Sequence, residues 1–390
     1  MNNVFRIRSI ALLVSTCITL GVIASCSEKL PEETLPSVPV TSAETSEETE
    51  ATTEETEPAH GPYSTPQVTE RPVDIHGQLK VDGLNIVDSN GETYRLKGMS
   101  SAGLNACTGF FNQETVKTLA QDWGCNVFRL AMTTEGNSDD YTSDPDKYFT
   151  EVCNDVNLCV DQGIYVIVDW HILYDGDPNQ YKTESIDFFT RLSTLYKDCP
   201  NIIYEICNEP NGNRFDDESK PVDWDNCIKP YAEEVIAAIR ANDPDNIIIV
   251  GTPTWSQDVD QASKNPVKGD NIMYTLHFYA GSHGQELRDK LVTANDNGCA
   301  VFVTEWGMTN DSGKGQIFKD ETMEWMNFLD ERNISWCNWS IGGSSTEASN
   351  ALKFRSNIIT VEEKYQGHWP DEFISNSGIF VRNLLLGREN

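Results

Sequence analysis

Basic residues are scarce in this 390-residue chain: 29 lysines and arginines stand against 61 aspartates and glutamates, a formal net charge of −32. Such an acidic surface argues against nucleic acid as a partner and against electrostatic attachment to anionic lipid. A neutral partner is not affected by this charge. The charge itself indicates a well-solvated, soluble surface.

Metal and cofactor motifs are also missing. The eleven cysteines include no C-x-x-C pair and no Cys/His spacing typical of a zinc site. Nine of them follow Cys26, so they cannot all pair with one another. Cys125, Cys207 and Cys337 lie in expected strands or next to them, where a small buried thiol is usual. GMSSAG, after the first expected strand, is not a phosphate-binding glycine fingerprint. We therefore expect neither a metal nor a cofactor.

The N-terminus has the features of an export signal. Arg6 and Arg8 precede an apolar run from residue 10 to 23 that is too short and too early for an ordinary membrane span. The run ends in Ile-Ala-Ser-Cys26, which resembles a bacterial lipobox. We expect residues 1–26 to be a signal segment with Cys26 lipidated; a plain secretory signal is the alternative. In both cases the protein is extracellular, and only the lipid would contact a membrane.

Residues 27–72 have a different composition. The stretch TSAETSEETEATTEETEP contains almost no apolar side chain. Such a segment cannot bury enough surface to offset the entropy lost on ordering. We expect a disordered, self-repelling linker that separates the signal segment from the domain formed by residues 73–390.

The remaining chain alternates short apolar runs with helical patterns. After a hairpin near residues 79–88, the expected strands are Arg95–Met99, Asn126–Ala131, Tyr165–Trp170, Ile202–Cys207, Ile247–Gly251, Met273–Phe278, Ala300–Glu305 and Ser335–Ser340. Expected helices include Gln113–Trp123, Ser185–Tyr196, Tyr231–Ala241, Gln316–Arg332 and Asp371–Leu386. Eight covered parallel strands predict an α/β fold, the (β/α)8 or TIM barrel. An open doubly wound sheet is the rival, and it lacks its usual fingerprint.

Polar or aromatic side chains stand where most of these strands end. The C-terminal ends of barrel strands form the active site in this fold. One such residue is more often a satisfied core group, but a set of them at one rim predicts a functional site. The set is Arg129, His171, Asn208, Glu209, His277, Tyr279, Glu305 and Trp339.

Two carboxylates in this set have the arrangement that glycosidic cleavage requires. One group must protonate the leaving oxygen and another must attack or stabilise the anomeric carbon. Glu209 and Glu305 follow strands on facing sides of the barrel, which allows the ~5–5.5 Å separation of retaining enzymes. Glu205 shares a strand face with Glu209 but lies four residues, ~13 Å, deeper. We expect it to form a buried ion pair with Arg129. Helix capping or surface salt bridges are the alternative for the two glutamates.

The two carboxylates need opposite protonation states. We expect Arg129 and Tyr279 to keep Glu305 ionised by charge and by hydrogen bonding, so that it serves as the nucleophile. The charge of Glu305 should raise the pKa of Glu209, which would then serve as acid and base.

The motifs IYEICNEP and VFVTEWG resemble those of glycoside hydrolase family 5, in its bacterial endoglucanase branch, and the resemblance covers residues 77–387. It implies Glu209 as acid/base, Glu305 as nucleophile and Asn208 as the partner of the sugar 2-hydroxyl in subsite −1. It further implies a polar shell of Arg129, His171, His277 and Tyr279, with Trp339 stacking under that sugar. Trp255, in TPTWSQD, would line the leaving-group side.

Two segments depart from the family pattern. Relatives usually read S-S-H-G-L-Q-W where residues 100–106 read SSAGLNA, so a histidine and a tryptophan are absent. They usually read W-S-L-S-D-K where residues 339–344 read WSIGGS, so a lysine is absent, although Glu347 offers a related acidic group. In the family these groups contact sugars beyond subsite −1 on the glycone side. We expect an intact catalytic centre with altered glycone contacts, which argues against crystalline cellulose as the preferred substrate.

The predicted function is a retaining endo-β-1,4-glucanase acting, as a monomer, on soluble or amorphous plant cell-wall polysaccharide or oligosaccharide. Activity on mannan, xyloglucan or mixed-linkage glucan is the close alternative. A surface protein that binds glycans through Trp255 and Trp339 without cleaving them belongs to a different class. A metal-dependent hydrolase is a third alternative, for which the sequence offers no ligand cluster.

Overall fold

The computed structural model describes residues 70–390 apart from 105–109, 136–138, 213–221, 343–347 and 354–368. The expected signal segment, Cys26 and nearly all of the expected linker lie outside the described residues. Among the described residues, no helix has the length and apolarity needed to cross a membrane.

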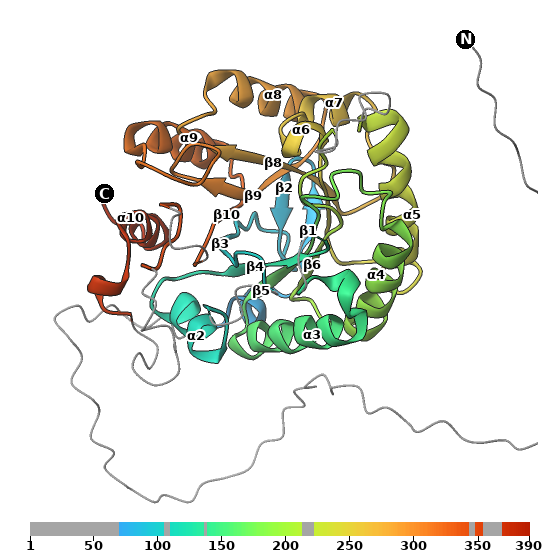
Figure 1. Cartoon of the computed structure of the whole chain (residues 1–390), viewed down its shortest axis with the longest axis horizontal. Helices are drawn as coiled ribbons and strands as arrows, with labels where there is room; N and C mark the ends of the chain where they lie inside the picture. Colours follow the sequence, from blue (N-terminus) through green and yellow to red (C-terminus); the bar gives the residue numbers. More distant parts are fainter. Residues whose placement is uncertain (1–69, 105–109, 136–138, 213–221, 343–347, 354–368) are drawn as a thin grey trace, which may run out of the picture. The chain divides into compact units, whose positions relative to one another are not determined.

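Eight parallel strands close into a barrel in the order β10-β3-β4-β5-β6-β7-β8-β9. The strands are β3 (Lys97–Ser100), β4 (Val127–Thr133), β5 (Tyr165–His171), β6 (Ile202–Glu205), β7 (Ile248–Val250), β8 (Ile272–Tyr279), β9 (Val301–Gly307) and β10 (Trp336–Asn338). Helices α2 (Gln113–Gln121), α3 (Pro145–Gln162), α4 (Lys182–Tyr196), α5 (Lys229–Arg240), α7 (Val259–Lys264), α8 (Gln285–Asp296), α9 (Lys319–Glu331) and α10 (Asn376–Leu385) surround the strands (Figure 1). The predicted (β/α)8 fold is confirmed.

Helix α3 illustrates how the sequence forms these outer elements. Asp144 accepts a hydrogen bond from the Lys147 amide at the N-terminus, and Pro145 occupies the first turn, where its missing N–H costs nothing. Gly163 ends the helix in the left-handed conformation, with φ of 67°. Buried residues recur at helical spacing on the barrel side: Tyr148, Phe149, Val152, Cys153, Val156 and Cys159. Capping and periodicity therefore specify the same helix.

Many predicted strand and helix boundaries differ from the structure by one or more residues. Strand β6 ends at Glu205, two residues before the predicted end, although the chain continues extended: the Asn208 amide still donates to the Trp170 carbonyl. Glu209 therefore lies beyond the strand. Helix α1 (Pro72–His76) includes Pro72, the last residue of the expected linker, and the Arg71 side chain donates to carbonyls at the C-terminus of α3.

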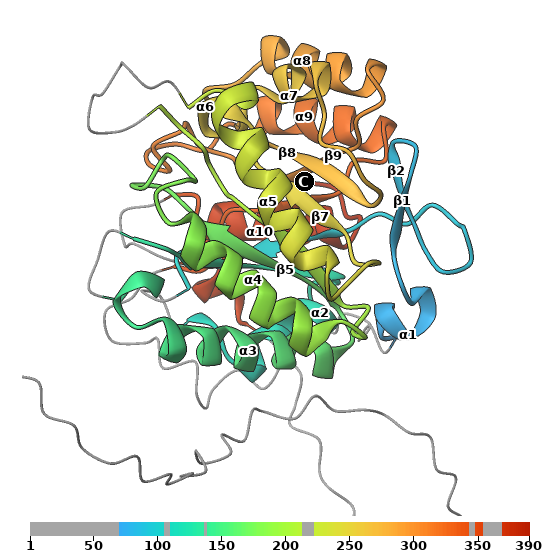
Figure 2. The ribbon, with the colours of Figure 1, turned by 90° about the vertical axis from the view of Figure 1, so that its right-hand side faces the viewer.

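The predicted hairpin is present as β1 (Lys80–Asp82) and β2 (Asn85–Val87), and it lies at one end of the barrel (Figure 2). Gln78 donates to Asn246 just before β7, and the Val81 amide donates to Asn271 just before β8. Because both contacts precede strands, the hairpin covers the N-terminal end of the barrel. The opposite end stays available for a site.

Side chains fill the barrel interior in layers. The lowest layer is apolar and includes Val127, Tyr165, Ile167, Ile203, Ile249, Met273, Phe302 and Cys337. Side chains alternate along a strand, so the inward residues two positions further along form the next layer. In β4, β5 and β6 these are Arg129, Asp169 and Glu205, all fully buried. A polar layer therefore lies between the apolar floor and the open rim.

Candidate active site

Arg129 organises the polar layer. Its guanidinium contacts three carboxylates: Asp169 at 2.9 Å, Glu205 at 2.7 Å and Glu305 at 3.1 Å. The expected ion pair between Arg129 and Glu205 is present. Glu205 precedes Glu209 by four residues in the chain. Coulomb attraction by Arg129 overcomes the effect of burial and lowers the pKa of Glu205 to about 2. Glu205 is therefore ionised and engaged, and it takes no direct part in the chemistry above it.

A β-bulge in β9 turns Glu305 into the barrel. Thr275 in β8 is paired with Phe302, but His277, two residues on, is paired with Glu305, three residues on. The extra residue breaks the alternation, so that Thr304 and Glu305 both contact interior groups while Val303 and Trp306 pack outside. Bulges re-aim side chains next to active sites in this way. Strict alternation would have left Glu305 on the face opposite Thr304.

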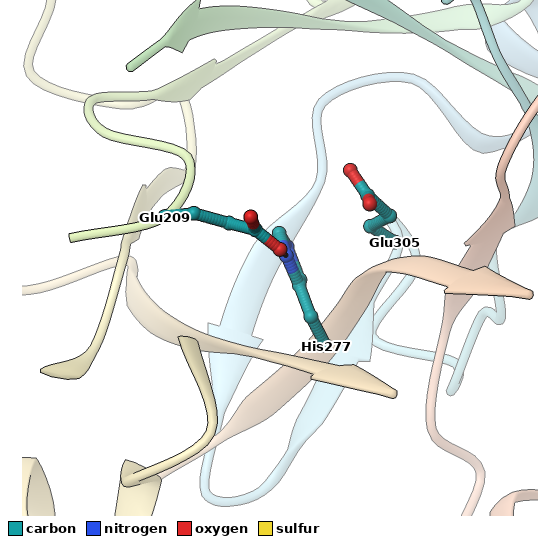
Figure 3. A group of neighbouring side chains, drawn as sticks. All are labelled: Glu209, His277 and Glu305. Atoms are coloured by element: carbon teal, nitrogen blue, oxygen red, sulfur yellow. Dashed lines mark hydrogen bonds and ion pairs between the residues drawn. The ribbon is translucent and has the colours of Figure 1, made fainter. Parts of the chain in front are cut away.

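Glu209, His277 and Glu305 converge at the open end of the barrel (Figure 3). One carboxylate oxygen of each glutamate and one ring nitrogen of His277 all lie within 4.8 Å of one another. His277 Nδ1 is 2.9 Å from Glu209 Oε1. Glu305 accepts hydrogen bonds from Tyr279 Oη at 2.7 Å and from Arg129 at 3.1 Å. Two carboxylates and an imidazole are also a donor set that divalent metals accept, and the sequence did not predict this cluster.

The electrostatics of Glu305 differ from the prediction. Its side chain is 6% exposed, and burial together with the charge of Glu209 raises the pKa of Glu305. The cations His277 and Arg129 act in the opposite direction and do not cancel this effect. The hydrogen-bond donors predicted for Glu305 are both present, but burial outweighs them. The expectation for Glu209 stays a prediction.

His171 and Trp339 form one wall of the site. Their rings are parallel within 4°, with centroids 5.3 Å apart. His171 Nδ1 is 2.7 Å from Asp169 Oδ2, which holds the ring orientation from below. Burial and the charge of Arg129 lower the pKa of His171 to about 4, so the ring is neutral at pH 7. Asp169 precedes His171 by two residues, and this spacing in VIVDWH could have identified it from the sequence.

Asn208 is held by both ends of its amide. Its Oδ1 accepts from Arg129 at 2.7 Å, and its Nδ2 donates to the Ile172 carbonyl at 3.0 Å. An amide nitrogen carries two hydrogens, so one of them has a second direction available. Asn208 also lines the cleft described below. A hydrogen bond from Asn208 to a ligand hydroxyl is therefore compatible with its fixed position.

Trp255 lies on a strained turn, α6 (Pro253–Ser256), and is 45% exposed. Thr254, Trp255 and Ser256 all have φ between 55° and 59°, a left-handed conformation that costs energy for residues other than glycine. The turn is fastened to the segment that carries Glu209. The Trp255 amide donates to the Pro210 carbonyl at 3.0 Å, and Ser256 Oγ donates to the Asn208 carbonyl at 2.6 Å.

These elements enclose a cleft of about 530 Å³, within the range of small-ligand sites. Eight side chains were predicted at the rim, and seven of them line the cleft: Glu209, Glu305, His171, Asn208, His277, Tyr279 and Trp339. Trp255, predicted on the leaving-group side, lines the cleft as well. Arg129 lies beneath the cleft. The sequence did not single out the other lining residues, which are Leu173, Thr254, Gln257, His283, Asp311, Ser312 and Gly313. They follow strand ends within loops, where no periodic pattern marks them.

The two departing segments are only partly described. Asn105, Ala106, Gly343, Ser344 and Glu347 lie outside the described residues. Gly342 is described, and a Cβ at this position would lie 2.3 Å from the ring of Phe110. Phe110 therefore occupies the space that a serine at position 342 would need. The segment that follows β3 therefore packs directly against the segment that follows β10.

The described cysteines are all unpaired and buried: Cys125, Cys153, Cys159, Cys199, Cys207, Cys227, Cys299 and Cys337. Burial raises the pKa of the Cys125 thiol. These thiols are small core side chains, as expected for Cys125, Cys207 and Cys337.

Residues 87–345 match the model of the family described as cellulase (glycosyl hydrolase family 5). The chain is 48% identical to an endoglucanase of Clostridium saccharobutylicum over 311 residues, which are 80% of this chain and 65% of the relative. It is 44% identical to endoglucanase 5 of Pectobacterium carotovorum subsp. carotovorum over 319 residues, 82% of this chain and 59% of the relative. The chain thus spans about three fifths of the length of these relatives.

Solved structures give the same result. The structure titled Cellulase Cel5C_n is 42% identical, covers 81% of this chain and 94% of its own, and superimposes with a TM-score of 0.73. The catalytic domain of Thermobifida fusca endoglucanase Cel5A, solved in complex with cellotetraose, is 31% identical with a TM-score of 0.74, covering 81% of this chain and 100% of its own.

Proposed function

Because this chain belongs to glycosyl hydrolase family 5, we propose that it is an endo-β-1,4-glucanase that cleaves soluble or amorphous β-glucan with retention of anomeric configuration. The observation that carries this proposal is the proximity of Glu209 and Glu305, with one oxygen of each within 4.8 Å. Retaining glycosidases place their two carboxyl groups ~5–5.5 Å apart, whereas inverting ones leave ~6.5–9.5 Å for a water molecule.

In the first step Glu305 attacks the anomeric carbon while Glu209 gives its proton to the glycosidic oxygen, and the C–O bond to the leaving sugar breaks. Arg129 and Tyr279 hold one orientation of the Glu305 carboxylate. In the second step Glu209, now ionised, takes a proton from water. That water displaces Glu305 from the anomeric carbon and regenerates both groups.

Two aromatic side chains in the cleft support a polymeric sugar as the substrate. Trp339 is stacked beside His171, and the exposed Trp255 also lines the cleft. Flat apolar rings fit the faces of pyranose rings, and the neighbouring polar groups fit their hydroxyls. The cellotetraose bound to the Thermobifida fusca relative supports the same class of ligand for this cleft.

Product analysis on a panel of polysaccharides tests the substrate. Purified protein should release short oligosaccharides from carboxymethylcellulose and barley β-glucan, and less from crystalline cellulose. Hydrolysis of mannan without hydrolysis of either glucan would replace the proposal by its close alternative. Glucan binding without any cleavage by the wild-type protein would favour the glycan-binding class.

The cluster of Glu209, His277 and Glu305 makes a metal-dependent reaction a specific second candidate. A metal held there would occupy both carboxylates that the double displacement needs. We expect unchanged hydrolysis after dialysis against EDTA. A loss of activity that added zinc, manganese or calcium restores would favour the metal-dependent reaction.

We also propose that the protein is a bacterial cell-surface lipoprotein, extracellular and monomeric, with Cys26 as the lipid-bearing residue. The lipobox-like Ile-Ala-Ser-Cys26 supports it. Expression in a bacterial host with labelled palmitate should label the wild-type protein. The Cys26→Ser variant should carry no label; labelling of this variant would contradict the assignment.

A further inference from the structure

The hydroxyl of Thr304 lies between Glu205, in the buried ion pair, and His277. Thr304 Oγ1 is 2.7 Å from Glu205 Oε1, 2.9 Å from His277 Nε2 and 2.5 Å from Thr275 Oγ1. The residue is fully buried below the cleft and is absent from the cleft lining. Thr304 therefore cannot act by contact with a sugar, and its effect must pass through one of these three neighbours.

The direction of each hydrogen bond follows from counting protons. Glu205 is ionised and accepts from Arg129 on both oxygens, so it can only accept, and the single hydroxyl proton of Thr304 points to it. Thr275 Oγ1 accepts the Thr304 amide hydrogen at 3.3 Å and is left to donate its own proton to Thr304. Thr304 Oγ1 can therefore only accept a hydrogen bond from its third neighbour, His277. The hydrogen of that contact must belong to His277 Nε2.

With a hydrogen on Nε2, the charge of the His277 ring decides whether the other nitrogen, Nδ1, donates or accepts a hydrogen bond. His277 Nδ1 is 2.9 Å from Glu209 Oε1, and this contact holds one hydrogen. In the cationic ring the hydrogen belongs to Nδ1, so Oε1 of Glu209 accepts it and the acid proton of Glu209 sits on Oε2, the other oxygen. In the neutral ring the hydrogen would come from Oε1, and the single acid proton of Glu209 would then face His277 and not the leaving sugar. Delivery of the proton from Oε2 therefore requires the cationic ring.

Four acidic side chains interact with the His277 ring: Glu205 and Glu209 from the segment of β6, Glu305 from β9 and Asp169 from β5. Burial lowers the pKa of His277, but these charges raise it to about 9. The ring is therefore cationic at neutral pH, with a hydrogen on each nitrogen. In this state Oε1 of Glu209 accepts from Nδ1, and Oε2 is left for the catalytic proton.

We propose that Thr304 is a positioning residue whose hydroxyl accepts the Nε2–H of His277 and so favours the doubly protonated ring, whose Nδ1–H engages Oε1 of Glu209 and leaves Oε2 as the oxygen that delivers the proton. The proposal rests on the proposed role of Glu209 as acid and base. Thr304 acts on the orientation of the catalytic groups and does not contact the substrate.

The direct test is the ring protonation of His277, measured in the full chain. The protein has six histidines, so 15N-histidine labelling gives a simple long-range 1H–15N spectrum, in which the His277→Gln variant assigns the signal. Above pH 9 the neutral ring of the wild type should carry its hydrogen on Nε2. Thr304→Ser, which keeps the hydroxyl, should show the same form. Thr304→Val, which has the same shape without the hydroxyl, should populate the Nδ1–H form.

Thr275→Val is the matched control, because it removes a neighbouring buried hydroxyl that does not contact His277. It should leave the Nε2–H form in place. A Thr304→Val protein that keeps Nε2–H, or a Thr275→Val protein that loses it as fully, would overturn the proposal. Because the spectrum does not depend on turnover, it tests Thr304 even if the protein proves to cleave no glucan.

The pH dependence of kcat/KM on a soluble glucan gives the second readout. In Thr304→Val the His277 cation loses its Nε2 acceptor, so the alkaline limb should move to lower pH by about one unit or more. Thr304→Ser should restore the wild-type limb. A merely structural role would lower the melting temperature of Thr304→Val and leave its pH limb unchanged, and that result would also overturn the proposal.

Discussion

Tyr279 and Arg129 are the two donors that favour the ionised form of Glu305. The geometry predicted from the residue types is present, with contacts of 2.7 and 3.1 Å. Their effect is limited because Glu305 lies at the bottom of the cleft, where burial and the charge of Glu209 raise its pKa. The burial of Glu305 and the charges around it therefore set its protonation state, which the residue types alone do not determine.

The first prediction concerns this balance. A raised pKa of Glu305 means that the nucleophile is protonated and inactive at low pH, and activity appears as pH rises. We expect the acidic limb of kcat/KM to lie above pH 4.5, the ordinary value for glutamate. Tyr279→Phe removes a hydrogen bond to the charged form, and such bonds contribute about 1.5–3 kcal/mol. The limb should then rise by about one pH unit or more.

The matched control is Tyr274→Phe, in the same strand. The Tyr274 hydroxyl accepts from the Val267 amide, away from the cleft. Its acidic limb should coincide with that of the wild type. An acidic limb of Tyr279→Phe that stays in place or moves to lower pH would show that Tyr279 does not stabilise the ionised nucleophile.

At the scale of elements, the turn Pro253–Ser256 is joined to the segment after β6 on both sides of Glu209, by the Trp255 amide and by the Ser256 side chain. Three consecutive residues with positive φ are held in a strained conformation there. Strain of this kind persists where the surrounding contacts determine it, and it concentrates at functional sites. The turn therefore positions both Trp255 and the acid/base residue.

Ser256→Ala removes the 2.6 Å hydrogen bond to the Asn208 carbonyl. We expect kcat on a β-glucan to fall roughly tenfold, since displacements of an ångström in a catalytic group cost up to ~10²-fold. An aryl cellobioside with a good leaving group needs little acid catalysis and should be affected less. Ser263→Ala is the control, since Ser263 donates to the Asp260 carbonyl in α7. Equal losses on both substrates would argue against a role in positioning the acid.

Most of the elements could be predicted because each strand and helix is specified by its own residues. All eight predicted strands are present, and α3 shows capping, periodicity and a glycine stop in one segment. The exact strand ends could not be predicted, because they depend on pairing partners distant in sequence. Strand β6 ends at Glu205, where its pairing with the three-residue strand β7 ends.

The candidate site was predictable from residue types at strand ends, but its internal geometry was not. The bulge in β9 depends on the pairing of Thr275 and His277 with Phe302 and Glu305, which VFVTEWG does not reveal by itself. Cleft residues such as His283 and Asp311 belong to loops that have no period. Which face a residue takes after a bulge or in a loop is decided by tertiary contacts.

At the scale of the whole molecule, the barrel interior combines an apolar floor with a buried charged layer. Replacing Arg129 would leave Asp169, Glu205 and Glu305 without their shared cation. Breaking one buried ion pair costs about 3–5 kcal/mol, because an uncompensated charge remains in the interior. The catalytic apparatus and the stability of the fold therefore depend on the same arginine.

We expect Arg129→Met to lower the free energy of unfolding by at least about 3 kcal/mol, measured by urea denaturation followed by tryptophan fluorescence. Lys264→Met is the control for loss of a surface pair. Lys264 is 64% exposed and 3.2 Å from Asp260, and exposed pairs of this type contribute about 0.3–0.5 kcal/mol. Similar unfolding energies for the two variants would contradict a central role of Arg129 in the fold.

We propose that Glu209 and Glu305 act by double displacement across one β-glycosidic bond. Proton NMR of the first products from a soluble cello-oligosaccharide, recorded before mutarotation, tests it most directly. We expect the β-anomer of the newly formed reducing end to appear first and the α-anomer to follow only by mutarotation. Initial formation of the α-anomer would mean inversion, and it would contradict the assignment of Glu305 as the nucleophile.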